Sequence, residues 1–301
     1  MTAPTPVAGA RVEHTGRGIA LLVAAVFSFA VMEAVAKWLA RSYPPPMITW
    51  ARYFLHALLM LVVLWPRMGA RLLATHRPGM QIVRGGLLGL SSLVFFTSLT
   101  VLPLADAGAI GAITPILVTV LAIRFLKERP PPGTWWALAA SFGGVLLIVR
   151  PGFGALSWWA MLPICSSLCY ATYQLMTRRL AGVDDSETTQ FFGAAVAGVV
   201  LSAVVPFFWR FPVSAFDMAL FASTGVIGWF GHMLLVRAFD HASATTLAPF
   251  SYAHLVGSLT LGFAVFGNLP DGPALVGMGV IVATGVWMAL RRRMPVEPVE
   301  D

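Results

Sequence analysis

The sequence predicts an all-α membrane protein with ten transmembrane helices, arranged as two inverted five-helix repeats with both termini cytoplasmic. Composition is the first observation behind this prediction. The 301 residues are 58% hydrophobic and 11% charged, whereas a soluble domain is about 25% charged. A span needs about 20 mostly apolar residues. Because the bilayer core offers no water to the backbone, each span must close its hydrogen bonds internally as a helix.

The second observation is a series of apolar runs separated by Pro, Gly and charged residues. The first run is too long for the apolar region of a signal peptide, which is about 7–15 residues, so we expect it to remain as a span. The turns at Pro103 and at 268–272 are short enough to make their flanking helices antiparallel neighbours. In order, the expected spans are 18–41, 47–65, 82–102, 104–125, 134–150, 156–179, 188–209, 214–237, 242–266 and 273–290.

The third observation is the distribution of basic residues between alternate loops, which reports orientation because Lys and Arg accumulate on the cytoplasmic side. Only Arg41, Arg150 and Arg210 are assigned to the face opposite the N-terminus. The face that carries the N-terminus is assigned Arg11, Arg17, Arg67, Arg71, Arg77, Arg84, Arg124, Lys127, Arg129, Arg178, Arg179, Arg237 and Arg291 to Arg293. This bias predicts an even number of spans with both ends inside the cell.

Several other functions are disfavoured by the same data. The net charge of +7 follows from the loop bias, so we expect no nucleic-acid partner. Cys165 and Cys169 share one face of an apolar helix, and no further ligand completes a metal site. No Gly-rich phosphate loop is present. We therefore predict no catalytic residue, no metal and no cofactor, and expect a small-molecule substrate and membrane lipid as partners, with a second copy of the chain as a further candidate.

A faint internal repeat divides the chain. The stretch 104–115 and the loop 125–130 are echoed by 242–249 and 265–270, each followed by a Gly-bearing apolar run that ends in Arg. Five spans is an odd number, so two such halves must lie inverted, a common plan of transporters. The predicted organisation is a cytoplasmic tail over 1–17, repeats over 18–150 and 156–291, and a second cytoplasmic tail over 292–301.

The residues that carry these patterns resemble the EamA-type transporters of the drug/metabolite transporter superfamily. The resemblance covers nearly the whole chain in five-plus-five order. It rests on Lys37, Arg52, the Ala-rich run through Pro115 into Glu128-Arg129-Pro130, and the Tyr252 helix that leads to Phe266-Gly267-Asn268-Leu269-Pro270. Family members usually carry Gly-Glu at both loop motifs, whereas this chain has Lys127-Glu128 and Gly267-Asn268. Glu33, Lys37 and Trp50-Ala51-Arg52-Tyr53 look most like the branch of riboflavin and S-adenosylmethionine uptake permeases.

Ionisable residues at membrane depth are functional candidates, because inserting one costs about 2.5–3.5 kcal/mol. Glu33 and Lys37 lie four residues apart and form either an intrahelical pair or a carboxyl at depth beside a Lys that extends to the interface. Glu33 is the expected proton-coupling residue. Arg52 and His56 lie on one polar stripe of the second span. Three roles are open to Arg52: it pairs with Glu33, it holds an anionic group of the substrate, or it extends to the lipid headgroups.

Three later spans carry narrow polar stripes, which line a cavity or bond helices together. Their candidates for substrate binding are Tyr170, Tyr173, His232 and His254, together with the deep aromatic residues Trp229 and Tyr252. Proline is an independent indicator, because Pro115 and Pro249 interrupt corresponding spans of the two halves. Matched helix breaks of this kind point to a transporter binding site.

The predicted function is a secondary transporter of the inner membrane, a multi-pass permease that moves a small organic metabolite by alternating access. Riboflavin or a related aromatic or nucleoside-like nutrient is the favoured substrate of uptake. Export of amino acids or drugs is the alternative. An intramembrane lipid-modifying enzyme is disfavoured, because such a site needs a nucleophile, a base and an orienting group at one membrane face.

Overall fold

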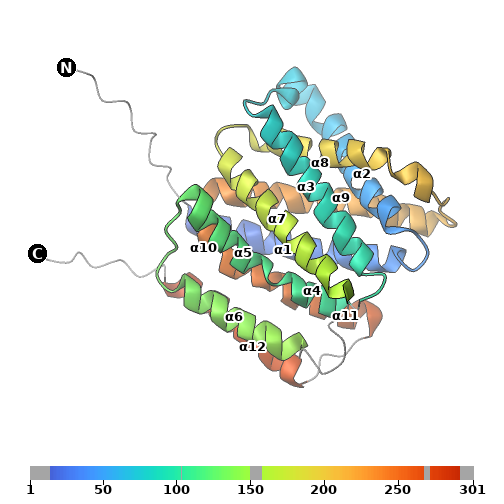
Figure 1. The fold of residues 1–301 in the computed structure, drawn as a ribbon. Coiled ribbons are helices and arrows are strands. Elements are labelled where there is room, and N and C mark those ends of the chain that lie inside the picture. Colours follow the sequence, from blue (N-terminus) through green and yellow to red (C-terminus); the bar gives the residue numbers. More distant parts are fainter. Residues whose placement is uncertain (1–13, 103, 150–157, 268–271, 292–301) are drawn as a thin grey trace, which may run out of the picture.

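The computed structural model describes residues 14–102, 104–149, 158–267 and 272–291, and these residues form helices with no β-strand (Figure 1). The first half holds α1 (Thr15–Leu39), α2 (Pro45–Met68), η1 (Gly69–Leu73), α3 (Pro78–Ser98), α4 (Leu104–Gly111), α5 (Thr114–Leu121), the π-helical turn η2 (Ala122–Leu126) and α6 (Thr134–Val149). The second half holds η3 (Trp158–Ala160), α7 (Met161–Leu180), α8 (Ser186–Ser202), η4 (Val205–Phe208), α9 (Ala215–His241), α10 (Ala244–Leu247), η5 (Ala248–Tyr252), α11 (Ala253–Phe266) and α12 (Gly272–Arg291).

The two halves contact each other in a pairwise symmetric way. Helix α1 packs on α9 as α7 packs on α3, and α2 packs on α9 as α8 packs on α3. Helix α1 also contacts α11, as α7 contacts α4 and α5. The pairs α2–α8 and α6–α12 join corresponding helices of the two halves, and α6 and α12 form one edge of the bundle (Figure 1). The contact pattern is therefore that of two repeats related by an approximate two-fold axis.

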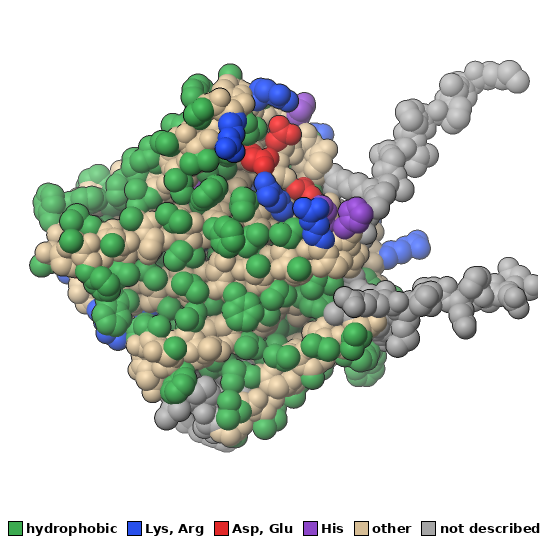
Figure 2. Space-filling view, turned by 180° about the vertical axis from the view of Figure 1, so that it is seen from behind, with side chains coloured by type: hydrophobic (Ala, Val, Ile, Leu, Met, Phe, Trp, Pro, Cys, Tyr) green, Lys and Arg blue, Asp and Glu red, His purple; other side chains and the backbone are tan. Residues whose placement is uncertain are grey.

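Five helical stretches are long and apolar enough to cross a membrane: Thr15–Leu39, Pro45–Leu73, Pro78–Ser98, Ala215–His241 and Ala244–Phe266. Shorter apolar helices lie within Thr114–Leu126, Thr134–Leu147 and Leu275–Met288. Hydrophobic side chains cover most of the face in Figure 2, and charged side chains gather mainly at one edge. An apolar exterior with charge at the ends is what hydrocarbon requires of a surface.

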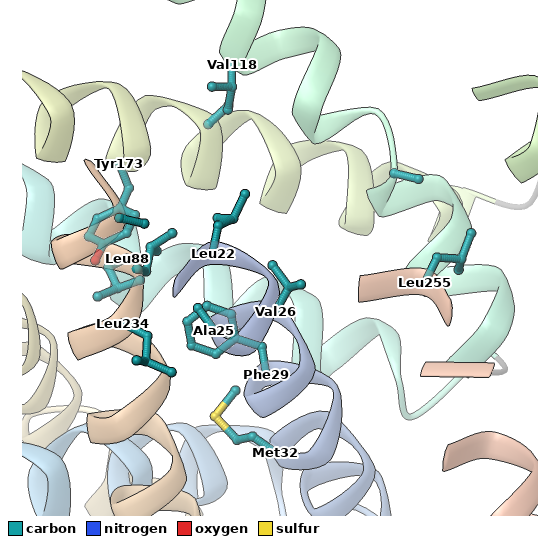
Figure 3. Close-up of a cluster of buried hydrophobic side chains, with 14 of the residues drawn as sticks. Leu22, Ala25, Val26, Phe29, Met32, Leu88, Val118, Tyr173, Leu234 and Leu255 are labelled. Carbon is teal, nitrogen blue, oxygen red and sulfur yellow. The ribbon is translucent and has the colours of Figure 1, made fainter. Parts of the chain in front are cut away.

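Helix α1 runs through the middle of the bundle. Its apolar residues Leu22, Ala25, Val26, Phe29 and Met32 meet side chains from α3, α5, α7, α9 and α11 (Figure 3). Because α1 packs on both halves, it positions its polar residues at the centre of the molecule.

One expectation about the loops is wrong. Arg84 lies inside α3 and is 0% exposed, whereas it was counted among the basic residues of the cytoplasmic face although it falls within the expected span 82–102. The third helix begins at Pro78, about one turn earlier than expected, and its buried polar residues Gln81 and Arg84 bond to partners inside the bundle. The loop charge bias therefore rests on the remaining basic residues.

Candidate functional site

A cavity lies between the two repeats beside the interrupted helices. Its empty volume is about 960 Å³, which includes the space at its open mouth. Both repeats contribute to the wall, from α1 to α5 and from α7, α9, η5 and α11. The polar lining residues are Glu33, Arg52, Ser91, Ser92, Thr114, Ser166, Ser167, Tyr170, Gln174, Ser251, Tyr252 and His254. A mostly apolar hollow with a few convergent polar groups is typical of a small-molecule site.

Arg52 of α2 is a buried cation on the cavity wall, with 5% of its surface exposed. Its Nη1 donates to Ser92 Oγ at 3.0 Å, and its Nη2 contacts His232 Nε2 at 2.9 Å. Within the described part of the chain, no carboxylate forms an ion pair with Arg52. Since burying an unpaired charge is costly, an anionic group in the cavity would be held strongly by this guanidinium.

Glu33 of α1 is paired across the two repeats. Its Oε2 lies 3.1 Å from His254 Nε2 of α11, and both side chains line the cavity. Lys37, one turn further along α1, instead donates to the carbonyl of Leu102 at 3.4 Å. The carboxyl group at depth thus faces a titratable imidazole from the opposite half.

Among the described residues that line the cavity, three buried polar atoms have no hydrogen-bond partner: Arg52 Nε, Glu33 Oε2 and Tyr252 Oη. The Glu33–His254 contact is close enough for an ion pair but is not aligned as a hydrogen bond. Buried polar groups are nearly always satisfied in folded proteins, so each exception calls for a reason. Toward a ligand in the cavity, Arg52 Nε can donate a hydrogen bond, Glu33 Oε2 can accept one, and Tyr252 Oη can do either.

A second layer of polar residues lies behind Arg52. Tyr173 Oη is 3.3 Å from His232 Nδ1, and the ring of His56 stacks on that of His232 at 6.0 Å. The Nε2 of His56 faces the side chain of Gln190 at 3.3 Å, which donates to a backbone carbonyl of α9. All of these side chains are buried, so Arg52 is backed by polar groups that water does not reach.

The structure places the predicted site residues in three positions. Glu33, Arg52, Tyr170, Tyr252, His254 and Pro115 line the cavity, whereas His56, Tyr173 and His232 lie one layer behind it. Trp229 packs instead against a separate apolar cluster of Met60, Leu72 and Phe191, away from the cavity lining. Pro249 is buried in η5 and is not a lining residue.

Both predicted helix interruptions are present at the prolines. Helix α4 ends at Gly111 and α5 begins at Thr114, with Pro115 as its second residue. A proline cannot donate to the carbonyl four residues earlier. That carbonyl, of Gly111, lies 3.4 Å from Ser167 Oγ of α7, whose shorter bond goes to the carbonyl of Pro163 at 2.7 Å. In the second half, Pro249 lies in the tight turn η5 between α10 and α11. The first break thus lies beside a hydroxyl of the other repeat.

A cluster of polar residues around Arg84 was not predicted from the sequence. Its Nη1 donates to Thr177 Oγ1 at 3.1 Å, and its guanidinium lies 5.1 Å from the centre of the Tyr173 ring. Arg84 Nε donates to Gln81, which in turn donates to Asp184 at 2.9 Å. The sequence signal for this cluster is the spacing of Gln81, Arg84 and Ser91, which places them on one face of the third helix. It was missed because Gln81 lies outside the expected span and Arg84 was counted with the loop charges.

A second overlooked group is Glu128, in the loop after η2. It accepts from Arg178 Nε at 3.1 Å and from the backbone N–H of Thr245 at 3.0 Å. Arg178 also donates to the carbonyl of Phe239 at 2.7 Å. These bonds join the loop of the first repeat to α7, α9 and α10 of the second. Glu128 is part of the motif that carries the family resemblance, and a carboxylate at a helix start is favourable.

No group of three His, Cys, Asp or Glu side chains that could hold a metal ion occurs among the residues that the structure describes. Cys165 and Cys169 are free thiols in the first half of α7, the first exposed and the second half-buried.

Comparison with known proteins identifies the family. The model of the EamA-like transporter family matches twice, at residues 16–150 and 157–291. A solved crystal structure aligns with a TM-score of 0.76 at 18% identity, covering 93% of this chain and 99% of the other, which shows that the two share a fold.

Relatives named for different substrates align over nearly the whole chain. The pseudopaline exporter CntI of Pseudomonas aeruginosa is 28% identical, with 92% of this chain and 97% of the relative covered. A riboflavin transporter of Rhizobium johnstonii is 27% identical, with 90% of each chain covered. An S-adenosylmethionine uptake transporter of Rickettsia conorii is 24% identical, with 90% and 92% covered. With the apolar helices and the double match, these findings make this chain a multi-pass membrane protein that belongs to the EamA-like transporter family.

Proposed function

We propose that this protein is a secondary transporter of the inner membrane, with ten spans and both termini cytoplasmic, which moves a small organic metabolite by alternating access. The observation that carries the proposal is the cavity shared by both repeats, which is lined by the buried charged groups Arg52 of α2 and Glu33 of α1, the latter paired with His254 of the other repeat. A carrier needs such groups between its halves, because substrate contacts then change as the halves move.

The symmetric contacts between the halves support this mechanism. The main cross-repeat helix pairs have counterparts, so exchanging the two halves' conformations would close the cavity at one end and open it at the other. Because each repeat has five expected spans, the repeats would be inverted in the membrane. Helix α1, packed against both repeats, would then carry Glu33 between two environments.

The favoured substrate is riboflavin or a related aromatic or nucleoside-like nutrient taken up by the cell. Support comes from aromatic rings at the cavity: Tyr170 stacks on Tyr173 at 5.6 Å, and Phe95, Phe96 and Tyr252 line the wall. Offset stacking on such rings suits a flat solute. Two of the relatives named above are uptake or riboflavin transporters.

A second candidate is export of an amino acid or a drug. The observation that favours it is Arg52, which is buried without an anionic partner and would bind a carboxylate through charge-assisted hydrogen bonds. One relative is an exporter. The two candidates differ in what Arg52 would do: an isoalloxazine ring needs stacking, whereas an amino acid needs the charge.

Glu33 is the proposed proton-coupling residue. It lines the cavity and lies 3.1 Å from His254, so it can exchange a proton both with the cavity and with a group on the opposite repeat. A carboxyl group that binds a proton at one face and releases it at the other would drive substrate movement with the gradient.

Flux into proteoliposomes tests these proposals. Purified protein is offered radiolabelled riboflavin, S-adenosylmethionine and a set of amino acids, with and without a pH gradient. We expect uptake of one class only, and Glu33→Gln should retain substrate exchange but lose the response to the gradient. Unchanged pH dependence in that variant would exclude the coupling role. Trp229→Phe, outside the cavity, is the matched control and should transport like the native protein.

A further inference from the structure

We infer that the connection between α8 and α9 is an interfacial membrane anchor, a loop that inserts its apolar side chains among the lipid headgroups. The connection comprises residues 203–214, includes η4 and lies at one end of the bundle (Figure 1). From 205 to 213 its sequence is Val-Pro-Phe-Phe-Trp-Arg-Phe-Pro-Val, so Arg210 is its only charged side chain. We call residues 205–213 the anchor loop.

The large apolar side chains of the anchor loop are exposed. Phe207 is 84% exposed, Phe211 is 81% and Val213 is 89%. Single exposed apolar residues are common on protein surfaces, but several within one short loop indicate a contact surface. Since each of these side chains favours leaving water, the anchor loop needs a partner that covers them.

The anchor loop is held in a defined position from its inner side. The N–H of Val213 donates to Tyr43 Oη at 2.9 Å, and that hydroxyl donates to Asp217 at 2.8 Å. The ring of Trp209 packs edge-on against Trp50 of α2, with the ring centres 5.7 Å apart. These contacts fix the loop against the connection between α1 and α2 and against α2 itself. The exposed side chains therefore belong to an ordered surface.

The backbone of the anchor loop suits a position with little water. An unpaired peptide N–H is costly away from water, and Pro206 and Pro212 have none. The N–H of Phe207 donates to the carbonyl of Val204 at 3.2 Å, and that of Val213 is bonded as described above. Headgroups and their water can serve the loop's other peptide groups, whereas hydrocarbon cannot. The loop therefore belongs at the depth of the headgroups.

Lipid is favoured over a protein partner because the exposed apolar surface continues onto the neighbouring helices. Val199 near the end of α8 is 72% exposed, and Phe216 at the start of α9 is 60% exposed. In a multi-pass membrane protein such surfaces face lipid. The anchor loop connects them without a polar boundary, so the bilayer that surrounds the helices also reaches the loop.

The one charged residue of the anchor loop agrees with this assignment. Arg210 is exposed, and its Nη1 donates to the carbonyl of Ser42 at 3.3 Å. A guanidinium carries several further donors, which can bind the phosphate of a lipid through charge-assisted hydrogen bonds. Aromatic residues are also enriched where a membrane meets water. The chemistry of the loop is thus that of a phospholipid interface.

The depth of the anchor loop in a bilayer tests the inference. In a chain with Cys165→Ala and Cys169→Ala, Phe211→Cys is labelled with a nitroxide, and the full-length protein is reconstituted into vesicles of phosphatidylcholine and phosphatidylglycerol. Saturation of the electron paramagnetic resonance signal reports collisions with oxygen, which concentrates in lipid, and with a water-soluble nickel chelate. Two labels on α8 are references: Val199→Cys on its apolar surface, and Asp185→Cys at its opposite, polar end.

We expect the label at Phe211 to collide with the nickel chelate several-fold less often than the label at Asp185, and with oxygen more often. Nickel collisions as frequent as those at Asp185 would place the loop in water and overturn the inference. Rare collisions with both reagents would show that protein covers the loop, as in a contact between two copies of the chain, and would overturn it equally.

Substitutions show whether the exposed side chains set this depth. With the label at Val213→Cys, the pair Phe207→Ser and Phe211→Ser should raise nickel collisions several-fold, whereas the matched pair Phe207→Leu and Phe211→Leu should keep them rare. Unchanged nickel collisions in the serine pair would contradict the anchoring role of the two rings. Each variant must elute from size exclusion as the native protein does, and the single change Phe207→Ser replaces the pair if it does not.

The inference goes beyond the proposed function, because it requires only that the chain lies in a membrane. The measurement needs no substrate. Absence of flux would therefore contradict the proposed transport and leave the anchor loop in place, whereas a loop found in water would contradict the anchor and leave transport untouched.

Discussion

Glu128 and Arg178 form an ion pair at 3.1 Å across the boundary between the two repeats. Both side chains are largely buried, with 13% and 15% exposed, and Glu128 also accepts backbone hydrogen bonds from the start of α10. These contacts therefore tie the loop after η2 to α7 and to α10, the short helix that precedes the turn with Pro249. Because the two partners belong to different repeats, the contact must change whenever the repeats move relative to each other.

The first prediction concerns the strength of this pair. Glu128→Ala should lower the thermal midpoint more than Glu128→Gln, because the amide still accepts from the N–H of Thr245. In a double-mutant cycle with Arg178→Ala we expect a coupling of about 0.5–3 kcal/mol, the range for residues in one polar network. Midpoints come from fluorescence-detected size exclusion after heating. Additive midpoint shifts would show that the pair contributes nothing beyond its separate contacts.

The second prediction concerns Lys127, whose backbone is left-handed at φ 56. A side chain with a Cβ pays about 1–2 kcal/mol in this region, whereas glycine adds about 0.5–1 kcal/mol of unfolded-state entropy. Lys127→Gly should therefore raise stability by about 0.5–1 kcal/mol, read as a higher melting midpoint. Gly267 occupies the matching position in the second repeat at φ 72. Gly267→Ala is the reverse control and should lower the midpoint.

The third prediction concerns the pH dependence that Asp184 gives to stability. Burial by itself raises the pKa of this carboxyl, but hydrogen bonds from Thr75 Oγ1, the His76 N–H and Gln81 outweigh it, and the net pKa is lower than usual. A depressed pKa in the folded state contributes stability above the unfolded value, near 4, that is lost as the pH falls through the folded pKa.

Comparison with Asp184→Asn measures this contribution. The native protein should melt at a higher temperature than the variant between about pH 5 and pH 8, and the gap should narrow once the carboxyl is protonated below about pH 4. Asp185→Asn is the neighbouring control. If the difference between the two melting temperatures grew as the pH fell, the pKa of Asp184 would not be lowered in the folded protein.

The fourth prediction concerns the crossing of α2 and α9. At Gly225 an added Cβ would lie 2.5 Å from Leu55 Cβ and 3.2 Å from the backbone nitrogen of His56. Gly225→Ala should therefore destabilise the protein by about 1–3 kcal/mol, as overpacked cores do. Gly262 of α11 has nothing within 4 Å of such a Cβ, so Gly262→Ala should be neutral or stabilising. Equal melting midpoints for the two variants would contradict this account of the crossing.

The helical architecture and the position of the helix breaks follow from local properties. Apolar length, proline and glycine act on the residues beside them, and the helices are interrupted near Pro115 and Pro249. Arg84 was misassigned for the opposite reason. The residues that accept its hydrogen bonds, Thr177 and Thr189, come from α7 and α8. Without knowledge of such distant partners, a charged residue is assigned to a loop.

For the candidate site too, local sequence properties and tertiary contacts supplied different information. The sequence selected Glu33, Arg52, Tyr170 and His254 as polar residues on apolar helices and Tyr252 as a deep aromatic residue, and all five line the cavity. These sequence properties did not distinguish the five from Trp229, which packs in a different cluster. An aromatic side chain is equally suited to a cavity wall and to an apolar core.

By itself, the sequence determined that the chain is helical, apolar and built from two similar halves, because these properties depend on residues close together along the chain. Only the tertiary structure decided which groups meet: Glu33 with His254, Arg52 with His232, and Arg178 with Glu128. Each of these pairs joins the two repeats. Their geometry depends on how one repeat packs against the other, and that packing is a sum of many side-chain contacts that no local pattern records.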